Sequence, residues 1–225
     1  MSSNESDTLN NNATQLVDQG KYEEALELFQ KVLLIDHEHY TALVNITSTL
    51  NELDRYEEAL PFIEKALSQN PDDFDAISRK ANSLYGMQEY ENAIQVFDRA
   101  LEFDPSYEVC LNNKGLCLTE LEKFEEAITC FDKVFESDPR NALAFSNKAT
   151  TLYDLKRDQE ALECLDRGLE INPHDTLILL NKADFMADAG KIDDALELCD
   201  KVLELESDND DAIKLKKELQ TLSSE

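Results

Sequence analysis

Glycine and proline are scarce in this sequence, with five residues of each among 225, and tryptophan is absent. So little glycine excludes a glycine-rich loop of the kind that cradles phosphate groups. No apolar run approaches the length of a membrane span, and the first six residues lack the basic and apolar regions of a signal peptide. We therefore expect no membrane segment and a cytoplasmic location.

Cysteine and histidine are too few and too scattered to build a reactive centre. The five cysteines form no framework, and their odd number at helical positions indicates free, buried or half-buried thiols in a reducing compartment. Cys110 and Cys117 are seven residues apart, but no third or fourth metal ligand lies near them. The three histidines fall in predicted turns, and no nucleophile stands beside a base. We therefore expect a non-enzymatic protein without a metal or a cofactor.

Basic residues are also in short supply. Lysine and arginine total 21 against 49 aspartates and glutamates, which gives a net charge of −28. This charge disfavours nucleic acid and anionic membrane surfaces as partners, because both would be repelled. Many carboxylates stand near predicted helix starts, where the helix dipole favours anions. The remaining surplus favours neutral or basic segments as partners.

What the sequence does contain is one pattern copied at a fixed spacing. An alanine recurs every 34 residues, as Ala25, Ala59, Ala93, Ala127, Ala161 and Ala195. Within each copy the apolar residues follow a helical period twice, with a break between. Proline ends the second helix at four equivalent positions: Pro71, Pro105, Pro139 and Pro173. Each copy is thus predicted to form a helix A, a tight turn and an antiparallel helix B, and the copies to stack into one elongated domain.

These copies resemble the tetratricopeptide repeat, over nearly the whole chain. That family has a large apolar residue at the fourth position of each repeat, matched by Leu9, Leu43, Ile77, Leu111, Phe145 and Leu179. Its small eighth residue is matched by Ala13, Thr47, Ala81, Gly115, Ala149 and Ala183. The resemblance implies an all-α fold, a right-handed superhelical solenoid of six antiparallel helix pairs plus a C-terminal capping helix.

The phase of the repeat sets the expected boundaries. After a flexible N-terminus at 1–5, six repeats span 6–39, 40–73, 74–107, 108–141, 142–175 and 176–209. Residues 210–222 form a further amphipathic helix with Lys217 at the small eighth position, where no partner helix would pack. We expect this helix to cap the array and residues 223–225 to be flexible.

Two residues depart from the repeat pattern. Pro61 falls inside helix B of the second repeat and predicts a kink or a displaced helix start. Asp158 stands where other repeats have tyrosine or phenylalanine, and it predicts a looser turn in the fifth repeat.

The resemblance also implies where a ligand would bind, because helices A of this family line a concave groove. The sixth position faces that groove and carries Asn11, Asn45, Arg79, Asn113, Asn147 and Asn181. An asparagine amide both donates and accepts, so it can pair with the C=O and the N–H of an extended peptide. Such a ladder is similar to that of O-linked N-acetylglucosamine transferase. The alternative is that asparagine is simply common at this position and points to water.

The neighbours of the ladder are mixed in character. Apolar and aromatic contacts are expected from Val44, Tyr85, Val109, Leu116, Leu143 and Tyr153, and negative charge from Asp75, Glu120, Asp154, Asp184 and Asp188. Leu177 and Leu180 either line the groove or pack against the capping helix. Four lysines directly follow the ladder: Lys80, Lys114, Lys148 and Lys182. Adjacent helical residues diverge by about 100°, so we expect these lysines at the seam between helix pairs, near acidic neighbours.

Several functions fit these features. The first is an adaptor that binds a neutral or basic extended segment of a protein or peptide in the groove. The second is a scaffold that self-associates into a homo-oligomer. A third is the grip of cochaperone repeats on acidic chaperone tails; Asn45 and Arg79 match two positions of that carboxylate clamp, but the others hold Asn10, Thr14 and Asp75.

Overall fold

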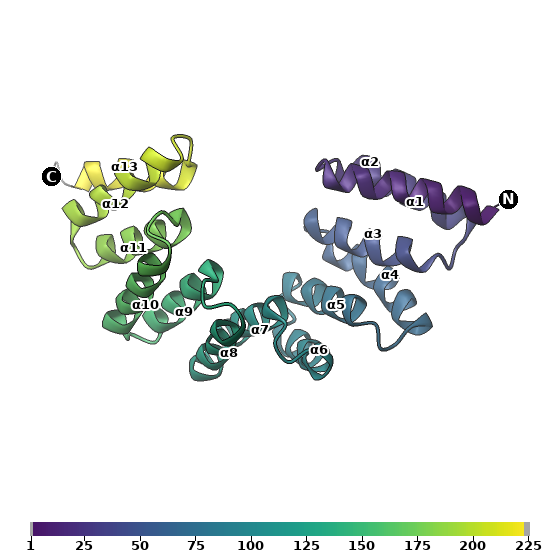
Figure 1. Cartoon of the computed structure of the whole chain (residues 1–225), viewed down its shortest axis with the longest axis horizontal. Coiled ribbons are helices and arrows are strands. Elements are labelled where there is room, and N and C mark those ends of the chain that lie inside the picture. The colour runs from purple at the N-terminus through teal and green to yellow at the C-terminus, as the bar shows by residue number, and fades with distance from the viewer. Residues whose placement is uncertain (1, 223–225) are drawn as a thin grey trace. The chain divides into compact units, whose positions relative to one another are not determined.

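The computed structural model describes residues 2–222, which form thirteen α-helices and no strand (Figure 1). Helices A are α1 (Ser2–Asp18), α3 (Tyr40–Glu52), α5 (Phe74–Gly86), α7 (Glu108–Glu120), α9 (Ala142–Asp154) and α11 (Thr176–Asp188). Helices B are α2 (Tyr22–Ile35), α4 (Tyr56–Gln69), α6 (Tyr90–Phe103), α8 (Phe124–Ser137), α10 (Asp158–Ile171) and α12 (Ile192–Leu205), and α13 (Asp210–Leu222) follows. The predicted all-α repeat fold is confirmed.

The helices group into two compact units, Met1–Cys117 and Leu118–Glu225, where the sequence predicted one domain. The boundary between them falls inside α7. Helix α1 begins at Ser2, so residues 2–5 are helical and not the flexible segment that was expected. The expectation of flexibility for residues 1 and 223–225 lies outside the described residues.

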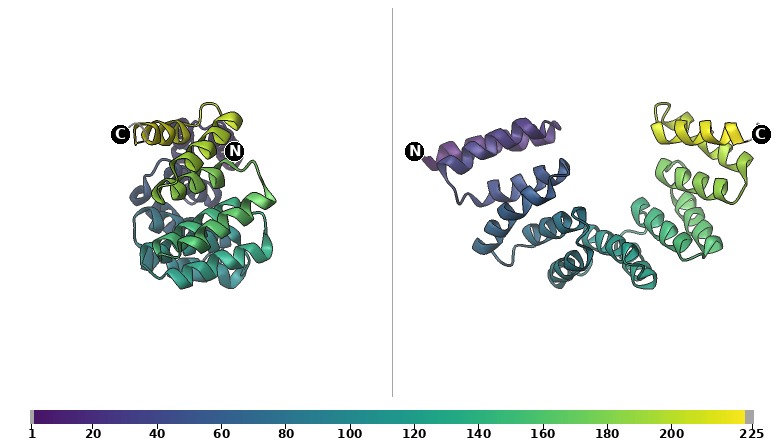
Figure 2. Two further views of the ribbon diagram at one scale, coloured as in Figure 1. Left: turned by 90° about the vertical axis from the view of Figure 1, so that its left-hand side faces the viewer. Right: turned by 180° about the vertical axis from the view of Figure 1, so that it is seen from behind.

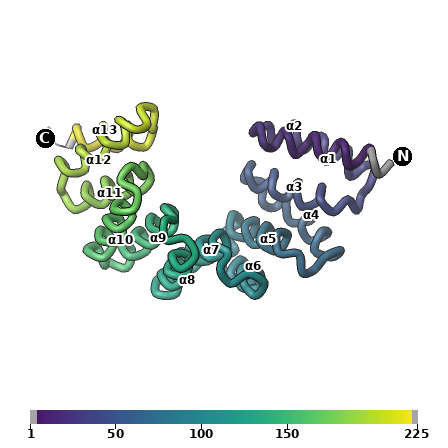
Figure 3. Tube along the Cα trace, viewed as in Figure 1, coloured from purple at the N-terminus to yellow at the C-terminus, as the bar shows by residue number. Residues whose placement is uncertain are grey.

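Small residues allow helix A and helix B to approach closely in the repeats that lie within one unit. The recurring alanine of helix B is fully buried in all six repeats. Four positions later a larger side chain is also fully buried: Phe29, Ile63, Phe97, Phe131, Leu165 and Cys199. Pairs such as α5 with α6, and α11 with α12, pack side by side within their own unit (Figures 2 and 3). The alternation of small and large residues read from the sequence therefore builds the core.

The last residue of a repeat caps the helix A that follows it. The Asp73 carboxylate accepts a hydrogen bond from the backbone N–H of Ala76 at 2.8 Å. Asn141 and Asp175 cap α9 and α11 in the same way, and Asn209 caps α13. Helices B lack side-chain caps among those described, but carboxylates occupy their first turns as predicted, where they meet the positive end of the dipole.

The turn between helix A and helix B contains one residue with left-handed backbone in each repeat. Gly20 and Gly190 hold this position in the first and sixth repeats, with φ of 71° and 72°. The other four repeats place residues with side chains there: Asp54, Gln88, Glu122 and Lys156. A left-handed conformation costs such residues about 1 kcal/mol or more, so these four turns are strained.

Exchanging residues at this turn position should change stability in opposite directions. Lys156→Gly should raise the free energy of unfolding by about 0.5–1 kcal/mol, because glycine adopts positive φ without strain. Gly190→Ala should lower it by about 1 kcal/mol, although no neighbouring atom lies within 4 Å of the added Cβ. Urea denaturation followed by circular dichroism checks both changes. Equal midpoints for both variants would contradict a cost set by the backbone.

The two departures from the repeat pattern leave the helices in phase. Helix α4 begins at Tyr56 and continues through the exposed Pro61, so the expected displaced start is wrong. Helix α10 begins at Asp158, and the turn before it keeps the same backbone bonds as the other repeats, such as Lys156 N–H to Tyr153 C=O at 2.9 Å. The expected loosening is absent from these bonds, because the turn is closed by backbone groups and not by the missing ring.

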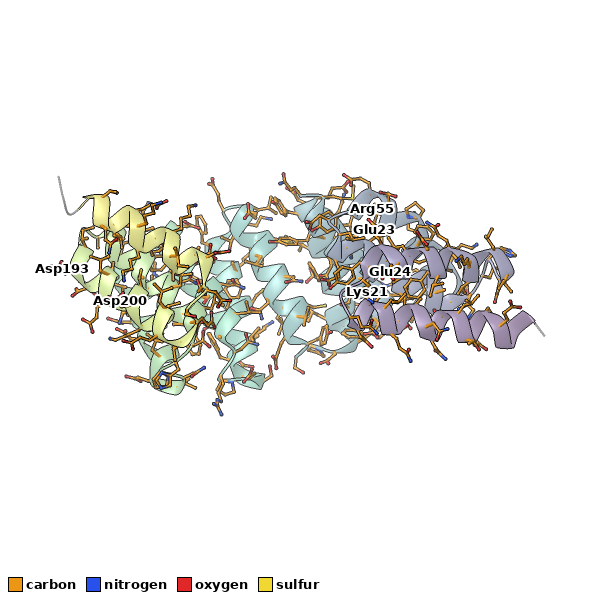
Figure 4. All side chains as sticks on the ribbon, turned by 90° about the horizontal axis from the view of Figure 1, so that it is seen from above. Lys21, Glu23, Glu24, Arg55, Asp193 and Asp200 are labelled. Atoms are coloured by element: carbon orange, nitrogen blue, oxygen red, sulfur yellow. The ribbon has the colours of Figure 1, made fainter. Side chains whose placement is uncertain are left out.

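Ion pairs join α5, α7, α9, α11 and α13 each to helix B of the preceding repeat. Lys80 Nζ lies 3.2 Å from a Glu64 carboxylate oxygen. Equivalent pairs are Lys114–Asp98, Lys148–Asp132, Lys182–Asp166 and Lys216–Asp200. This confirms the predicted seam position of the four lysines and adds a fifth. Arg55 similarly joins Glu58 of its own helix at 2.7 Å to Glu23 of the preceding repeat at 3.3 Å (Figure 4). Exposed pairs of this kind stabilise little individually, about 1 kcal/mol at most.

Candidate functional site

In the first unit, the sixth residues of helices A bond to the ninth residue of the preceding helix A. Asn45 donates from Nδ2 to Thr14 Oγ1 at 3.3 Å, and Asn113 donates to Asn82 Oδ1 at 2.8 Å. The guanidinium of Arg79 donates to Ser48 Oγ. These side chains therefore hold neighbouring repeats together, which leaves fewer of their donors for a ligand. Asn11, in α1, is exposed.

A cavity of about 320 Å³ opens beside Arg79 in the same unit. Its lining comes from helices A and one turn: Ser48, Asn51, Glu52, Asp54, Tyr56, Arg79, Asn82, Tyr85 and Asn113. The Arg79 Nε is buried and has no hydrogen-bond partner among the described residues. The Tyr56 ring occupies the space beside Gly86, where an added Cβ would lie 2.3 Å from it. A hydrogen bond to Asp54 raises the pKa of Tyr56 to about 12.

Two further predicted contacts of the first unit differ in accessibility. Val44 is only 8% exposed, because it packs in a cluster with Ile63, Ala66 and Ala76. Leu116, in α7, is half-buried. A ligand on this face would therefore meet Leu116 more readily than Val44.

In the second unit, the ladder residues are unpaired. Asn147 and Asn181 are half-buried, and neither side-chain amide makes a hydrogen bond to another described residue. Each therefore keeps two donors and an acceptor for a ligand. The sixth position thus has two kinds of member: Asn45, Arg79 and Asn113 of the first unit bond the preceding helix A, whereas Asn147 and Asn181 of the second unit do not.

Tyr153, in α9, is fixed by contacts with α11, the next helix A. Its ring stacks on Phe185 with centroids 4.5 Å apart, and its hydroxyl donates to Asp188 at 2.9 Å. The bond to Asp188, with burial, raises the pKa of Tyr153. In the third repeat the equivalent Tyr85 instead contacts Tyr90, with centroids 6.0 Å apart. Asp158 replaces that ring in the fifth repeat, so Tyr153 contributes a flat, rigid surface between α9 and α11.

Helices α11 and α13 enclose a second cavity, of about 310 Å³. It is lined by the second, fifth, sixth and ninth residues of both helices: Leu177, Leu180, Asn181 and Asp184 from α11, and Asp211, Lys214, Leu215 and Glu218 from α13. Leu180 packs on the core shared with α13, which is one of the two roles predicted for this pair, whereas Leu177 remains 38% exposed. Burial, then the nearby Asp188, Glu218 and Asp211, raises the pKa of Asp184.

The cysteines are buried, and burial shifts the pKa of three of their thiols. All five cysteines are free and buried, as predicted. Burial raises the pKa of Cys164 to about 11 and also raises those of Cys110 and Cys199. Within residues 2–222, no three histidine, cysteine or carboxylate side chains gather in a way that could hold a metal ion. In the same range no helix is both long and apolar enough to cross a membrane.

Family comparisons agree with the fold. The family model described as tetratricopeptide repeat matches residues 16–76, 118–183 and 159–219. A model for subunit 3 of the anaphase-promoting complex, or cyclosome, matches residues 52–134. The chain therefore belongs to the tetratricopeptide repeat family, whose members are generally non-enzymatic modules for protein interaction. No curated protein matches the sequence.

Several solved structures have a similar fold at low sequence identity. A tetratricopeptide repeat protein from Parabacteroides merdae has a TM-score of 0.79 at 19% identity, over 97% of this chain and 87% of that one. PilW, a type IV pilus biogenesis factor, has a TM-score of 0.79 at 19% identity, over 93% and 97%. The Cut9–Hcn1 hetero-tetramer of the APC/C has a chain with a TM-score of 0.76 at 14% identity, over 95% of this chain and 42% of that one. These identities support a shared fold alone.

Proposed function

We propose that the chain is an adaptor that binds an extended protein segment along helices A, and that Asn147 and Asn181 form its main contacts. The observation that carries this proposal is that both amides lack hydrogen-bond partners although each is half-buried. Their donors and acceptors are therefore open to a partner, and a peptide backbone supplies the matching acceptor and donor.

The surroundings of these amides suit a peptide. Leu143 and Leu177 are 57% and 38% exposed on α9 and α11, and the stacked rings of Tyr153 and Phe185 lie on the same helices. Apolar side chains of a bound segment would gain free energy on this surface, at about 25 cal/mol per Å² buried. Backbone bonds would then hold the segment with little dependence on its sequence. One structure named above, the Cut9–Hcn1 hetero-tetramer, contains a chain of similar fold within a protein complex, which agrees with an adaptor.

Removing both amides should weaken peptide binding by about 10–100-fold, because two to four hydrogen bonds are lost. The probes are peptides selected on the wild-type chain from a phage-displayed library of random dodecapeptides. Fluorescence anisotropy then compares the wild type with the Asn147→Ala/Asn181→Ala variant. Peptides with N-methylated backbones should bind the wild type weakly too, because methylation removes the N–H donors.

The matched control is Asn92→Ala/Gln95→Ala, which removes two exposed amides from helix B α6. Its affinity for every probe should equal that of the wild type. Equal binding by the Asn147→Ala/Asn181→Ala variant, with its helix content intact by circular dichroism, would refute a role for the ladder. Failure to select any peptide from the library would refute peptide binding as such.

A further inference from the structure

The cavity between α11 and α13 repeats the geometry of a groove between two helices A. Its lining residues from α13 are the second, fifth, sixth and ninth of that helix, in the same register as those from α11. Helix α13 also continues the series of ion pairs, since Lys216 pairs with Asp200 of α12 as the earlier lysines pair with carboxylates of their helices B. It therefore takes the place of a seventh helix A, and its exposed side chains stand where a ligand would pass.

Two kinds of surface meet in this cavity. Leu177, Leu180 and Leu215 form an apolar wall, and the amide of Asn181 is unpaired beside them. Asp184, Asp211 and Glu218 supply carboxylates, against one cation from Lys214. This combination matches a lysine or arginine side chain, whose aliphatic stem packs on apolar surface while its charged end stays near water and carboxylates.

Like charges lie close together in this cavity. Burial and the nearby carboxylates of Asp188, Glu218 and Asp211 raise the pKa of Asp184, because they disfavour its ionised form. Elsewhere on this unit, carboxylates such as Asp132, Asp166 and Asp200 are paired with lysines. A cation from a partner would relieve the repulsion that the chain's own residues leave in place.

We infer that α11 and α13 together form a subsite for a lysine or arginine side chain of the bound segment. This rests on the proposed function, because the segment reaches the subsite by binding along helices A. The partner is thus a basic extended segment, with its cationic residue adjacent to the stretch that Asn181 contacts. Helix α13 belongs to the binding surface and is more than a cover for the apolar end of α12.

The test uses one selected dodecapeptide, resynthesised with lysine, arginine, norleucine or glutamate at each position in turn. At one position, lysine and arginine should bind about five- to tenfold more tightly than norleucine, and glutamate more weakly still. Raising the salt from about 50 to 300 mM should reduce this preference, since exposed charges are screened. Norleucine keeps the aliphatic stem, so the difference isolates the charge.

Substitutions in the cavity test whether its carboxylates cause the preference for lysine over norleucine. Asp184→Asn/Glu218→Gln should remove the preference for lysine over norleucine while the norleucine peptide binds as before. Lys214→Gln should strengthen lysine binding about twofold, an effect that a merely damaged fold would not produce. Asp193→Asn/Asp208→Asn removes two charges outside the cavity and should leave the preference unchanged; Asp193 lies on α12 (Figure 4).

The outcomes separate the two ideas. If peptides bind through Asn147 and Asn181 but show no preference for a basic residue, the adaptor function stands and the subsite is overturned. A preference that survives in Asp184→Asn/Glu218→Gln also overturns the subsite, because the charge that recognises lysine then lies elsewhere. If no dodecapeptide binds, the adaptor function fails and the subsite fails with it.

Discussion

Phe97→Ala should lower the free energy of unfolding by about 3–5 kcal/mol, the range for removing a buried aromatic ring. Phe97 lies in α6 and is fully buried against Ile77, Ala81 and Ala93 in the core of the third repeat. These neighbours are held by helical backbone on both sides, so they cannot close the cavity that alanine leaves. Urea denaturation followed by circular dichroism measures the change.

The matched control lies on the same helix. Phe103 is 49% exposed at the C-terminal end of α6, so Phe103→Ala should cost about 1 kcal/mol or less. Repeats contact mainly their neighbours, so hydrogen exchange in Phe97→Ala should accelerate in α5 and α6 and much less in α11 and α12. Similar losses for the two variants would show that the third repeat is not packed around Phe97.

The repeat unit was predictable from the sequence because its stability depends on local spacing. The buried alanine of helix B and the large residue four positions on, such as Ala93 and Phe97, recur in phase and carry the packing. The left-handed turn was harder to foresee. Gly20 and Gly190 are signals for it, but Lys156 and Gln88 are not, because backbone hydrogen bonds impose positive φ on them.

The candidate site was only partly predictable. Asn113 and Asn147 are the same residue at the same repeat position, yet only Asn113 bonds a neighbouring side chain. The ninth residue of the preceding repeat could have predicted this difference. For Asn113 that residue is Asn82, which offers an acceptor, whereas for Asn147 it is Leu116, which does not. The ninth residue does not decide every case. Thr150 holds that position in the repeat before Asn181 and could accept a hydrogen bond, but none forms between the two side chains. Side-chain geometry decides such cases, and residue type alone does not.

From the sequence, helix α13 was predicted only as a cap, and the cavity that it lines was missed. The prediction of a cap rested on Lys217, which stands where the other helices A have a small residue packed against helix B. Lys217 is exposed, as that prediction requires. Asp211, Leu215 and Glu218 occupy the second, sixth and ninth positions of α13 and line the cavity between α13 and α11. The residue that prevents further packing and the residues that line the cavity thus lie on different faces of one helix.

Ala183→Lys should destabilise the second unit by about 3 kcal/mol or more, because it places an unpaired ammonium group in the core. Ala183 is the small eighth residue of α11 and is fully buried beside Ala195 and Cys199 of α12. The longer side chain also overpacks this contact, which adds about 1–3 kcal/mol. Methionine has a similar length but no charge, so Ala183→Met should lower the free energy of unfolding only by the contribution from overpacking. Urea denaturation separates the two contributions.

Lys217 provides the natural comparison, since it is a lysine at the same repeat position. It is exposed on α13, so Lys217→Ala should change the free energy of unfolding by less than about 0.5 kcal/mol. If Ala183→Lys were tolerated equally well, α11 and α12 would not close around this position. The expected contrast means that a small eighth residue is needed only where a helix B covers helix A. Without that cover, α13 can carry a lysine on one face and still present Asp211, Leu215 and Glu218 on another.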